Sequence, residues 1–319
     1  MLYRLLKIPA AFSFWLYCRQ LRVSNKELFN AKGPLLIASN HPNSFLDAII
    51  ISALFKRPVH SLARGDAFKN KFVAWLLRSL NMLPVYRTSE GVENMEHNYT
   101  TFEACKQLFK NNGIVLIFSE GRCVNEWHLR ALKKGTARLA ISSWQEGIDL
   151  KILPLGINYQ GFKIFGKNIH LNFGSIITKQ EVDLNDGFGK SVLSFNNKLQ
   201  NQLQPLVYEV DKDDLAARQR KFAVPVSGIR KILLFIPALA GYVIHFPLLY
   251  AVKKVAGKLG GHNDHYDSFV IVLLFLSYPF YALLLSIFIF FAGAGWFGWL
   301  SFLWLPFLGW SYMQLKKQF

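Results

Sequence analysis

The sequence contains little cysteine. Its 319 residues include only Cys18, Cys105 and Cys123, which are too few and too scattered for a disulfide framework or a zinc site. A reducing compartment is therefore the expected environment, and no metal site is expected. Cys123 lies beside a polar motif described below, where a packing role is favoured over the role of a nucleophile.

Acidic residues are also scarce. There are 20 of them against 37 lysines and arginines, which gives a formal net charge of +17. Such a surplus attracts nucleic acids, anionic lipids or anionic substrates. No segment resembles a nucleic-acid-binding motif, whereas long apolar segments are present. We therefore expect membrane phospholipids, and not nucleic acid, as partners.

Charge is absent altogether from residues 268–315. A helix needs about 20 apolar residues to cross a bilayer, so this segment is long enough for a transmembrane hairpin that turns near the sequence FAGAGWFGW. Its tryptophans suit positions near lipid headgroups. The alternative is a buried hydrophobic hairpin within the protein core.

Residues 232–252 form a second apolar segment, interrupted by Pro237, Gly241 and Pro247. Basic residues precede this segment and also follow the hairpin, and the positive-inside bias therefore places both ends in the cytoplasm. That requires an even number of crossings. We expect residues 232–252 to dip into the membrane or lie in its plane, and the part of the chain that precedes them to face the cytoplasm.

The N-terminal segment, residues 1–30, has a short apolar stretch between basic residues. Residues 8–18 are too few to span a bilayer, and no small-residue cleavage site follows, so a signal peptide is not expected. An amphipathic helix in the membrane interface is predicted. A first helix that packs against the core is the alternative.

Residues 31–225 alternate between short apolar runs and longer segments with helical spacing. The predicted strands are 35–38, 59–63, 82–86, 114–118, 152–159 and one within 167–178, and the predicted helices are 72–80, 99–109, 137–144 and 190–209. This alternation is typical of an α/β fold with a sheet covered by helices. Residues 226–319 are expected to form a C-terminal α-helical membrane anchor.

The segment NHPNSFLD places His41 directly after a predicted strand and Asp47 in the first turns of a helix. Ligands bind at the carboxyl ends of strands in open α/β sheets. An imidazole can accept a proton from a hydroxyl nucleophile, and a carboxylate can orient the ring. Equally, Asp47 can be a favourable first-turn charge and His41 an ordinary loop residue.

Later segments present basic residues at strand ends and at a helix start. Arg87 ends the segment MLPVYR, Glu120, Gly121 and Arg122 follow the predicted strand 114–118, and Lys133 and Lys134 precede a helix. Guanidinium groups bind phosphate through paired hydrogen bonds, and helix N-termini favour anions. Together these residues predict a phosphate-binding site, although each alone is typical of a solvated surface charge.

Four segments between residues 32 and 159, in the order NHPNSFLD, LPVYR, FSEGR with KKGTARLA, and LPLGINY, resemble the glycerolipid acyltransferase family. This family includes lysophosphatidic acid and glycerol-3-phosphate acyltransferases. The resemblance implies a mixed sheet covered by helices and a catalytic pair of His41 and Asp47. It also implies that Arg87, Glu120, Gly121 and Arg122 bind the acceptor and that Pro154 marks the strand shaping the acyl pocket.

The sequence departs from the family pattern in two blocks. Five residues separate His41 from Asp47, where the family has four. In the third block Ser119 replaces the usual proline, and Arg122 comes one place earlier than the family's arginine. The first departure weakens the geometric argument for the pair, and the second weakens the assignment of the acceptor site.

The resemblance implies acyl transfer in phospholipid biosynthesis as the function. The acyl group would pass from an acyl thioester, acyl-CoA or acyl carrier protein, to a hydroxyl of a glycerol-phosphate acceptor such as lysophosphatidic acid or glycerol-3-phosphate. No metal or other cofactor is expected. The alternatives are another lysolipid acceptor or a non-catalytic membrane lipid-binding protein. A lipid hydrolase is disfavoured because Ser119 lacks the G-x-S-x-G motif.

Overall fold

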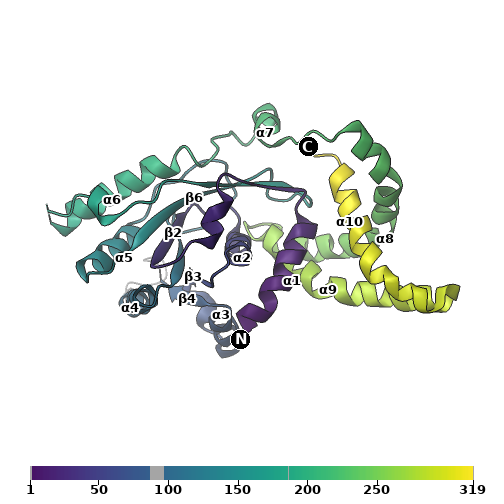
Figure 1. Cartoon of the computed structure of the whole chain (residues 1–319), viewed down its shortest axis with the longest axis horizontal. Coiled ribbons are helices and arrows are strands. Elements are labelled where there is room, and N and C mark those ends of the chain that lie inside the picture. The colour runs from purple at the N-terminus through teal and green to yellow at the C-terminus, as the bar shows by residue number, and fades with distance from the viewer. Residues whose placement is uncertain (1, 87–96, 186, 319) are drawn as a thin grey trace.

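The computed structural model of the protein describes residues 2–86, 97–185 and 187–318. Helix α1 (Leu2–Tyr17) comes first (Figure 1). The strands that follow are β1 (Gln20–Val23), β2 (Leu35–Ser39), β3 (Val59–Arg64), β4 (Met82–Val85), β5 (Ile114–Phe118), β6 (Lys151–Tyr159) and β7 (Asn168–Phe173). The helices between and after them are α2 (Ser44–Leu54), α3 (Lys71–Ser79), α4 (His97–Lys110), α5 (Lys134–Gln145), α6 (Phe188–Leu203) and α7 (Leu215–Phe222).

The seven strands form one sheet in the order β1-β7-β6-β2-β5-β3-β4. Strands β6 and β7 pair antiparallel, whereas the other neighbouring pairs are parallel. The mixed sheet covered by helices is therefore confirmed. Strands β2 and β5 are direct neighbours, with Ser39 opposite Phe118. The loops that carry His41 and Glu120 consequently leave the sheet side by side.

The predicted boundary between residues 30 and 31 needs correction. Helix α1 ends at Tyr17, and residues 20–23 form strand β1, which pairs with β7 at the edge of the sheet. The sheet therefore begins inside the segment predicted as an N-terminal helix. The sequence QLRV is short and lacks an apolar run, so its strand conformation depends on pairing with a segment far along the chain.

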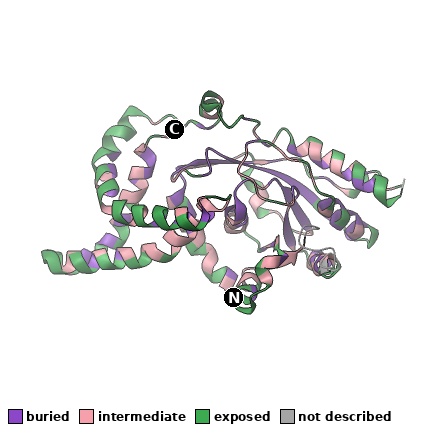
Figure 2. Ribbon diagram, turned by 180° about the vertical axis from the view of Figure 1, so that it is seen from behind, coloured by how far each residue is buried: buried purple, intermediate pink, exposed green. Residues whose placement is uncertain are grey.

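Alternating side chains of the central strands divide the core into two layers. In β2, Leu35 and Ile37 face a layer that includes α1, α2 and parts of the C-terminal helices, whereas Leu36 and Ala38 face α4, α5 and α6. Figure 1 shows α4, α5 and α6 on one side of the molecule and α1 and α2 on the other. The central strands β2, β5 and β6 are buried on both faces (Figure 2), which accounts for their continuous apolar runs.

The C-terminal region contains α8 (Gly228–Gly260), α9 (Tyr266–Ile289) and α10 (Ser301–Leu315). Residues 232–252 lie within the single helix α8, which continues through Pro237 and Pro247. Between α9 and α10 the chain bends at Gly293 and Gly295, whose φ angles are 108° and 50°. This bend lies within the FAGAGWFGW segment that was predicted as the turn of the hairpin.

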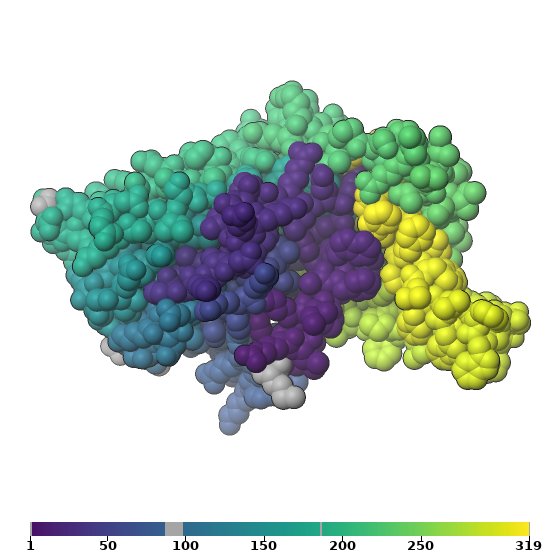
Figure 3. All heavy atoms as spheres, in the orientation of Figure 1, coloured from purple at the N-terminus to yellow at the C-terminus, as the bar shows by residue number. Residues whose placement is uncertain are grey.

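Two helical stretches, Gly228–Gly260 and Tyr266–Leu315, are long and apolar enough to cross a membrane. In each, only 22% of the most apolar window is buried within the protein. Large side chains such as Phe291 and Trp296 are 80% exposed, and Figure 3 shows this region projecting from the α/β body. An exposed apolar surface of this kind indicates membrane association. The placement of residues 232–252 and of α1 in the membrane stays a prediction.

Replacement of Gly156 by alanine should destabilise the sheet. A Cβ at Gly156 in β6 would lie 2.4 Å from the carbonyl oxygen of Leu206. That oxygen accepts hydrogen bonds from Asn158 and Asn172 and therefore cannot move freely. We expect the free energy of unfolding to fall by about 1–3 kcal/mol, as for other overpacked sites, measured by thermal unfolding in detergent.

Gly189→Ala is the matched control, because a Cβ at Gly189 in α6 meets no heavy atom within 4 Å. Equal melting temperatures for the two variants would contradict the close approach of β6 and Leu206.

Candidate active site

His41 and Asp47 form a direct hydrogen-bonded pair. His41 Nδ1 lies 2.9 Å from Asp47 Oδ2, and the Asp47 side chain is fully buried, whereas 15% of the His41 side chain is exposed. Asp47 therefore orients the ring from within the protein, while the other edge of the ring faces a cavity. The pair predicted from the sequence is present in the geometry that general base catalysis requires.

The connection between His41 and Asp47 includes Ser44 in an unusual conformation. Ser44, the first residue of α2, has a φ of 51°, which lies in the left-handed region that non-glycine residues seldom adopt. Five residues separate His41 from Asp47, and the two side chains are nevertheless in contact. The family's shorter spacing is thus not needed for contact between the two side chains.

Three hydrogen bonds hold the Asp47 carboxylate. Besides contacting His41, Oδ2 accepts the backbone N–H of Asn43 at 2.9 Å. Oδ1 accepts the hydroxyl of Tyr159, at the end of β6, at 2.6 Å. Burial and the nearby Asp47 raise the pKa of Tyr159 well above its ordinary value, so the hydroxyl remains a donor. A buried carboxylate with this many partners is fixed in position.

The His41 ring is also fixed from its flat side. It stacks on Phe118, the last residue of β5, with ring centroids 3.8 Å apart and planes 7° from parallel. Because Nδ1 contacts the carboxylate, the tautomer that carries its proton on Nδ1 leaves Nε2 as the proton acceptor. Among the described residues, no hydrogen bond to His41 Nε2 is formed, so Nε2 is available to a substrate hydroxyl.

Glu120 connects two loops through its carboxylate. Oε2 accepts the backbone N–H of His41 at 2.9 Å, and Oε1 accepts the backbone N–H of Arg130 at 2.9 Å. The side chain is buried, and burial raises its pKa above the ordinary value of a glutamate. Glu120 thus sets the position of the His41 backbone. Contact between Glu120 and the acceptor, which the resemblance implies, stays a prediction.

Gly121 permits a turn that no larger residue would make. Its φ is 73°, and a Cβ there would lie 2.8 Å from Cγ of Lys133. The turn directs Glu120 into the protein and leaves Arg122 exposed at the cavity. Lys133, which precedes α5, and Lys134, its first residue, line the same cavity. The predicted Arg87 lies outside the described residues.

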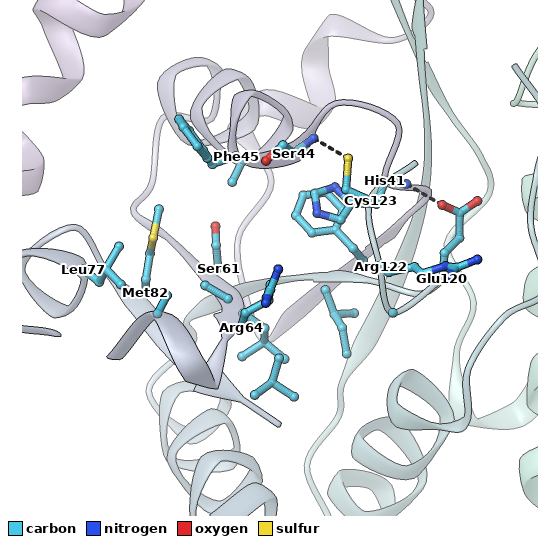
Figure 4. Close-up of a pocket in the computed structure, with 18 of the residues that line it drawn as sticks. His41, Ser44, Phe45, Ser61, Arg64, Leu77, Met82, Glu120, Arg122 and Cys123 are labelled. Carbon is cyan, nitrogen blue, oxygen red and sulfur yellow. Dashed lines mark hydrogen bonds between the residues drawn. The ribbon is translucent and has the colours of Figure 1, made fainter. Parts of the chain in front are cut away.

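A cavity of about 2050 Å³ opens at the carboxyl ends of β2, β3 and β5. One part of its lining is basic, with Arg122, Arg130, Lys133, Lys134 and Arg138. Another part is apolar and comes from α1, α2, α3 and α9, including Leu6, Ala48, Leu77, Phe269 and Phe275. In Figure 4, Leu77 and Met82 lie on one side, and His41, Glu120 and Arg122 on the other. Pro154 is not among the lining residues.

Cys123 makes a structural contact beside the pair. Its Sγ accepts the backbone N–H of Ser44 at 2.9 Å (Figure 4), and burial raises the pKa of the thiol far above its ordinary value. A protonated thiol is a poor nucleophile, which agrees with the predicted packing role. Because the N–H groups of Asn43 and Ser44 are both engaged, neither is free to bind an oxyanion.

Sequence reasoning missed several residues of the site. Tyr159, Phe118, Arg130 and the residues at the start of α9 contact the pair or line its cavity. None of them carries a local signal, since Tyr159 lies 112 positions from Asp47. Only the polar end of an otherwise apolar strand, Asn158 to Gln160, could have drawn attention to Tyr159.

Residues 20–158 match the family model described as Acyltransferase. This part of the chain is therefore similar to an acyltransferase domain. The family predicted from the four motifs is thereby confirmed, and the class of reaction is acyl transfer. The acyltransferase domain contains His41, Asp47 and the whole basic part of the cavity.

No curated protein matches the chain. Among solved structures, the chain is similar to the 1-acyl-sn-glycerophosphate (LPA) acyltransferase PlsC from Thermotoga maritima, at 15% sequence identity and a TM-score of 0.46. This similarity covers 63% of the present chain and 78% of the other.

Replacement of Glu120 by glutamine should loosen the loop that carries His41. A glutamine offers only one acceptor oxygen, so the N–H of either His41 or Arg130 would lose its partner. We expect the free energy of unfolding to fall by about 1–3 kcal/mol, the cost of an unpaired buried group, together with a reduced rate of acyl transfer. Thermal unfolding and turnover measure the two effects.

Glu126→Gln is the control, because Glu126 lies in the same loop and its carboxylate pairs with His128 and Arg130 near the surface. If Glu120→Gln matched the wild type in both measurements, the connecting role of Glu120 would be wrong.

Proposed function

We propose that the protein transfers a fatty acyl group from an acyl thioester to a hydroxyl of a glycerol-phosphate acceptor at a membrane. The observation that carries this proposal is the position of the His41–Asp47 pair in one cavity that has both a basic and an apolar lining. An acyl ester of glycerol phosphate has the same two parts, an anionic headgroup and a hydrocarbon chain.

The basic lining supports an anionic acceptor. Arg122, Lys133 and Lys134 are exposed at the cavity, and no ion pair involves them among the described residues. Arg130 and Arg138 line the cavity beside them. Guanidinium and ammonium groups at a helix N-terminus favour phosphate. A phosphate bound there would hold its glycerol hydroxyl near His41.

The apolar lining supports an acyl chain that comes from the bilayer. Leu6 of α1 and Leu77 of α3 line it together with Phe275 of α9, a helix of the apolar C-terminal region. A chain in this part of the cavity would be removed from water, and each buried CH₂ contributes about 0.8 kcal/mol. An acyl chain bound there would place its thioester carbonyl near the His41–Asp47 pair.

The reaction needs a single proton transfer to His41. Nε2 takes the proton of the acceptor hydroxyl while the hydroxyl oxygen attacks the thioester carbonyl carbon. Asp47 stabilises the resulting imidazolium through Nδ1. The carbon–sulfur bond then breaks, the ester forms, and the thiolate leaves and takes up the proton. No acyl-enzyme is required, so the protonated thiol of Cys123 has no part in the reaction.

The charge distribution supports a cytoplasmic acyltransferase domain. Basic residues cluster before α8, and Lys316 and Lys317 follow α10. Positive charges near membrane segments favour the cytoplasmic side. Both ends of the C-terminal region, and the domain attached to it, would then face the cytoplasm, where acyl-CoA and acyl carrier protein occur.

His41→Ala should abolish transfer while leaving the fold intact. Removal of the general base should lower turnover at least about 100-fold, the lower range of acid–base contributions. The assay offers purified protein a labelled acyl thioester, on CoA or on acyl carrier protein, with a panel of glycerol-phosphate and other lysolipid acceptors. Separation of the products identifies donor and acceptor.

His128→Ala is the matched control, because the His128 side chain is 50% exposed and pairs with Glu126. Free fatty acid formed without acceptor would point to a hydrolase instead. Unchanged turnover in His41→Ala would remove the proposed mechanism.

Arg122→Ala should weaken acceptor binding more than it slows chemistry. Loss of one charge-assisted contact to phosphate costs about 1.5–3 kcal/mol, so we expect the KM for the acceptor to rise at least about 10-fold while kcat changes little. Arg57→Ala controls for net charge, because Arg57 is exposed and lies outside the cavity lining. Equal KM values in the two variants would exclude Arg122 from the acceptor site.

A further inference from the structure

The connection between α8 and α9 lies directly against the loop that carries His41. Asp264 Oδ1 accepts the backbone N–H of Asn125 at 3.2 Å, and Asn125 in turn donates to the carbonyl of Pro42 at 2.7 Å. The ring of His265 hydrogen-bonds through Nδ1 to the Ser44 hydroxyl. Residues 264 and 265 thus contact the loop after β5 and the segment that joins His41 to Asp47.

The first turn of α9 reaches further into the site. Ser268 Oγ accepts the backbone N–H of Leu46 at 3.2 Å and donates to the carbonyl of Asn43 at 3.4 Å. Both partners belong to the stretch between His41 and Asp47. A hydroxyl of the apolar C-terminal region therefore fixes the backbone that joins the two catalytic residues.

Asp267 is a buried carboxylate surrounded by donors. Oδ1 accepts the hydroxyl of Tyr17 at 3.0 Å, and Oδ2 accepts the side-chain amide of Asn43 at 2.8 Å and the ammonium of Lys167. Asp267 and Lys167 are both buried, with side chains 1% and 0% exposed. Three parts of the chain, α1, the loop before β7 and the loop after β2, therefore converge on one residue of α9.

Asn43 connects this cluster to the catalytic carboxylate. Its backbone N–H donates to Asp47 Oδ2, and its side-chain amide donates to Asp267 Oδ2. Asn43 begins α2 as its N-cap residue, but its side chain makes no capping bond. The amide is instead committed to α9, so a shift of Asp267 would move the N–H that orients Asp47.

We propose that residues 264–268 are a positioning element of the active site, with Asp267 and Ser268 as its principal residues. The C-terminal region then has a second role besides membrane association, because it sets the geometry of the His41–Asp47 pair through Asn43. This inference rests on the proposed function, since positioning is measured by the rate of acyl transfer.

A buried ion pair is not needed for stability alone. Replacement of such a pair by apolar residues of similar volume is often neutral or stabilising, whereas loss of one partner leaves an uncompensated charge. A role in stability and a role in positioning are therefore separable. The double variant Lys167→Met with Asp267→Leu removes both charges and also removes the acceptor of the Asn43 amide.

The test compares the double variant and Ser268→Ala with Ser277→Ala in full-length protein. Ser277 lies on the same helix, and among the described residues its hydroxyl donates only to the carbonyl of Leu273. Misplacement of catalytic groups by about 1 Å can cost 100-fold in rate. We expect kcat to fall at least about 10-fold in the double variant and about 3-fold in Ser268→Ala, with KM nearly constant and Ser277→Ala unchanged.

Thermal unfolding accompanies each assay. A folded double variant with wild-type kcat would overturn the proposal. If that variant fails to fold, Ser268→Ala decides, because a rate equal to that of Ser277→Ala overturns the proposal and a selective loss of kcat supports it.

Failure of the proposed function has a different signature. If the wild type transfers no acyl group to any acceptor, the ¹⁵N resonances of His41 still report the geometry of the pair. The chemical shifts of Nδ1 and Nε2 should differ between the wild type and Ser268→Ala, and should be the same in Ser277→Ala and the wild type. Identical chemical shifts in all three proteins would overturn the positioning role independently of activity.

Discussion

The arrangement of the site depends on keeping one carboxylate, that of Asp47, buried and correctly oriented. An ionised carboxylate away from water is costly unless hydrogen bonds replace its hydration. Asp47 obtains them from His41, from the backbone of Asn43 and from the hydroxyl of Tyr159. These partners come from the loop after β2, the start of α2 and the end of β6, so the sheet must be formed before the site can exist.

Because Asp47 must keep its orientation, hydrogen bonds and ring stacking also hold the neighbouring loops in place. Glu120 binds the backbone of His41 and of Arg130, so the loops after β2 and β5 move as one unit. Phe118 fixes the plane of the His41 ring. A proton can then be transferred along a defined direction. Preorganisation of this kind lowers the cost of orienting the reacting groups.

Local patterns in the sequence predicted the central strands and most of the helices, since β2, β3 and β5 are apolar runs and α4 to α6 have helical spacing. They also predicted the contact between His41 and Asp47, which lie in one short segment. They could not predict β1, whose conformation comes from pairing with β7, or the left-handed conformation of Ser44. Tyr159 and Asp267 were missed because the contacts that define them join residues 112 and 224 positions apart.

The polar residues that begin α9 lie at the start of a long segment without charge, residues 268–315. The composition of that segment did not indicate a role for them in the site. Composition predicts a membrane anchor there, and the exposed apolar surface of α8 to α10 agrees with that role. Yet Asp267 and Ser268 are buried at the boundary between that region and the acyltransferase domain. A carboxylate at such a boundary is stable only if the domain supplies its partners, here Tyr17, Lys167 and Asn43. The two parts of the protein must therefore dock in one relative orientation, and that orientation places the apolar side chains of α9 in the wall of the same cavity that His41 faces.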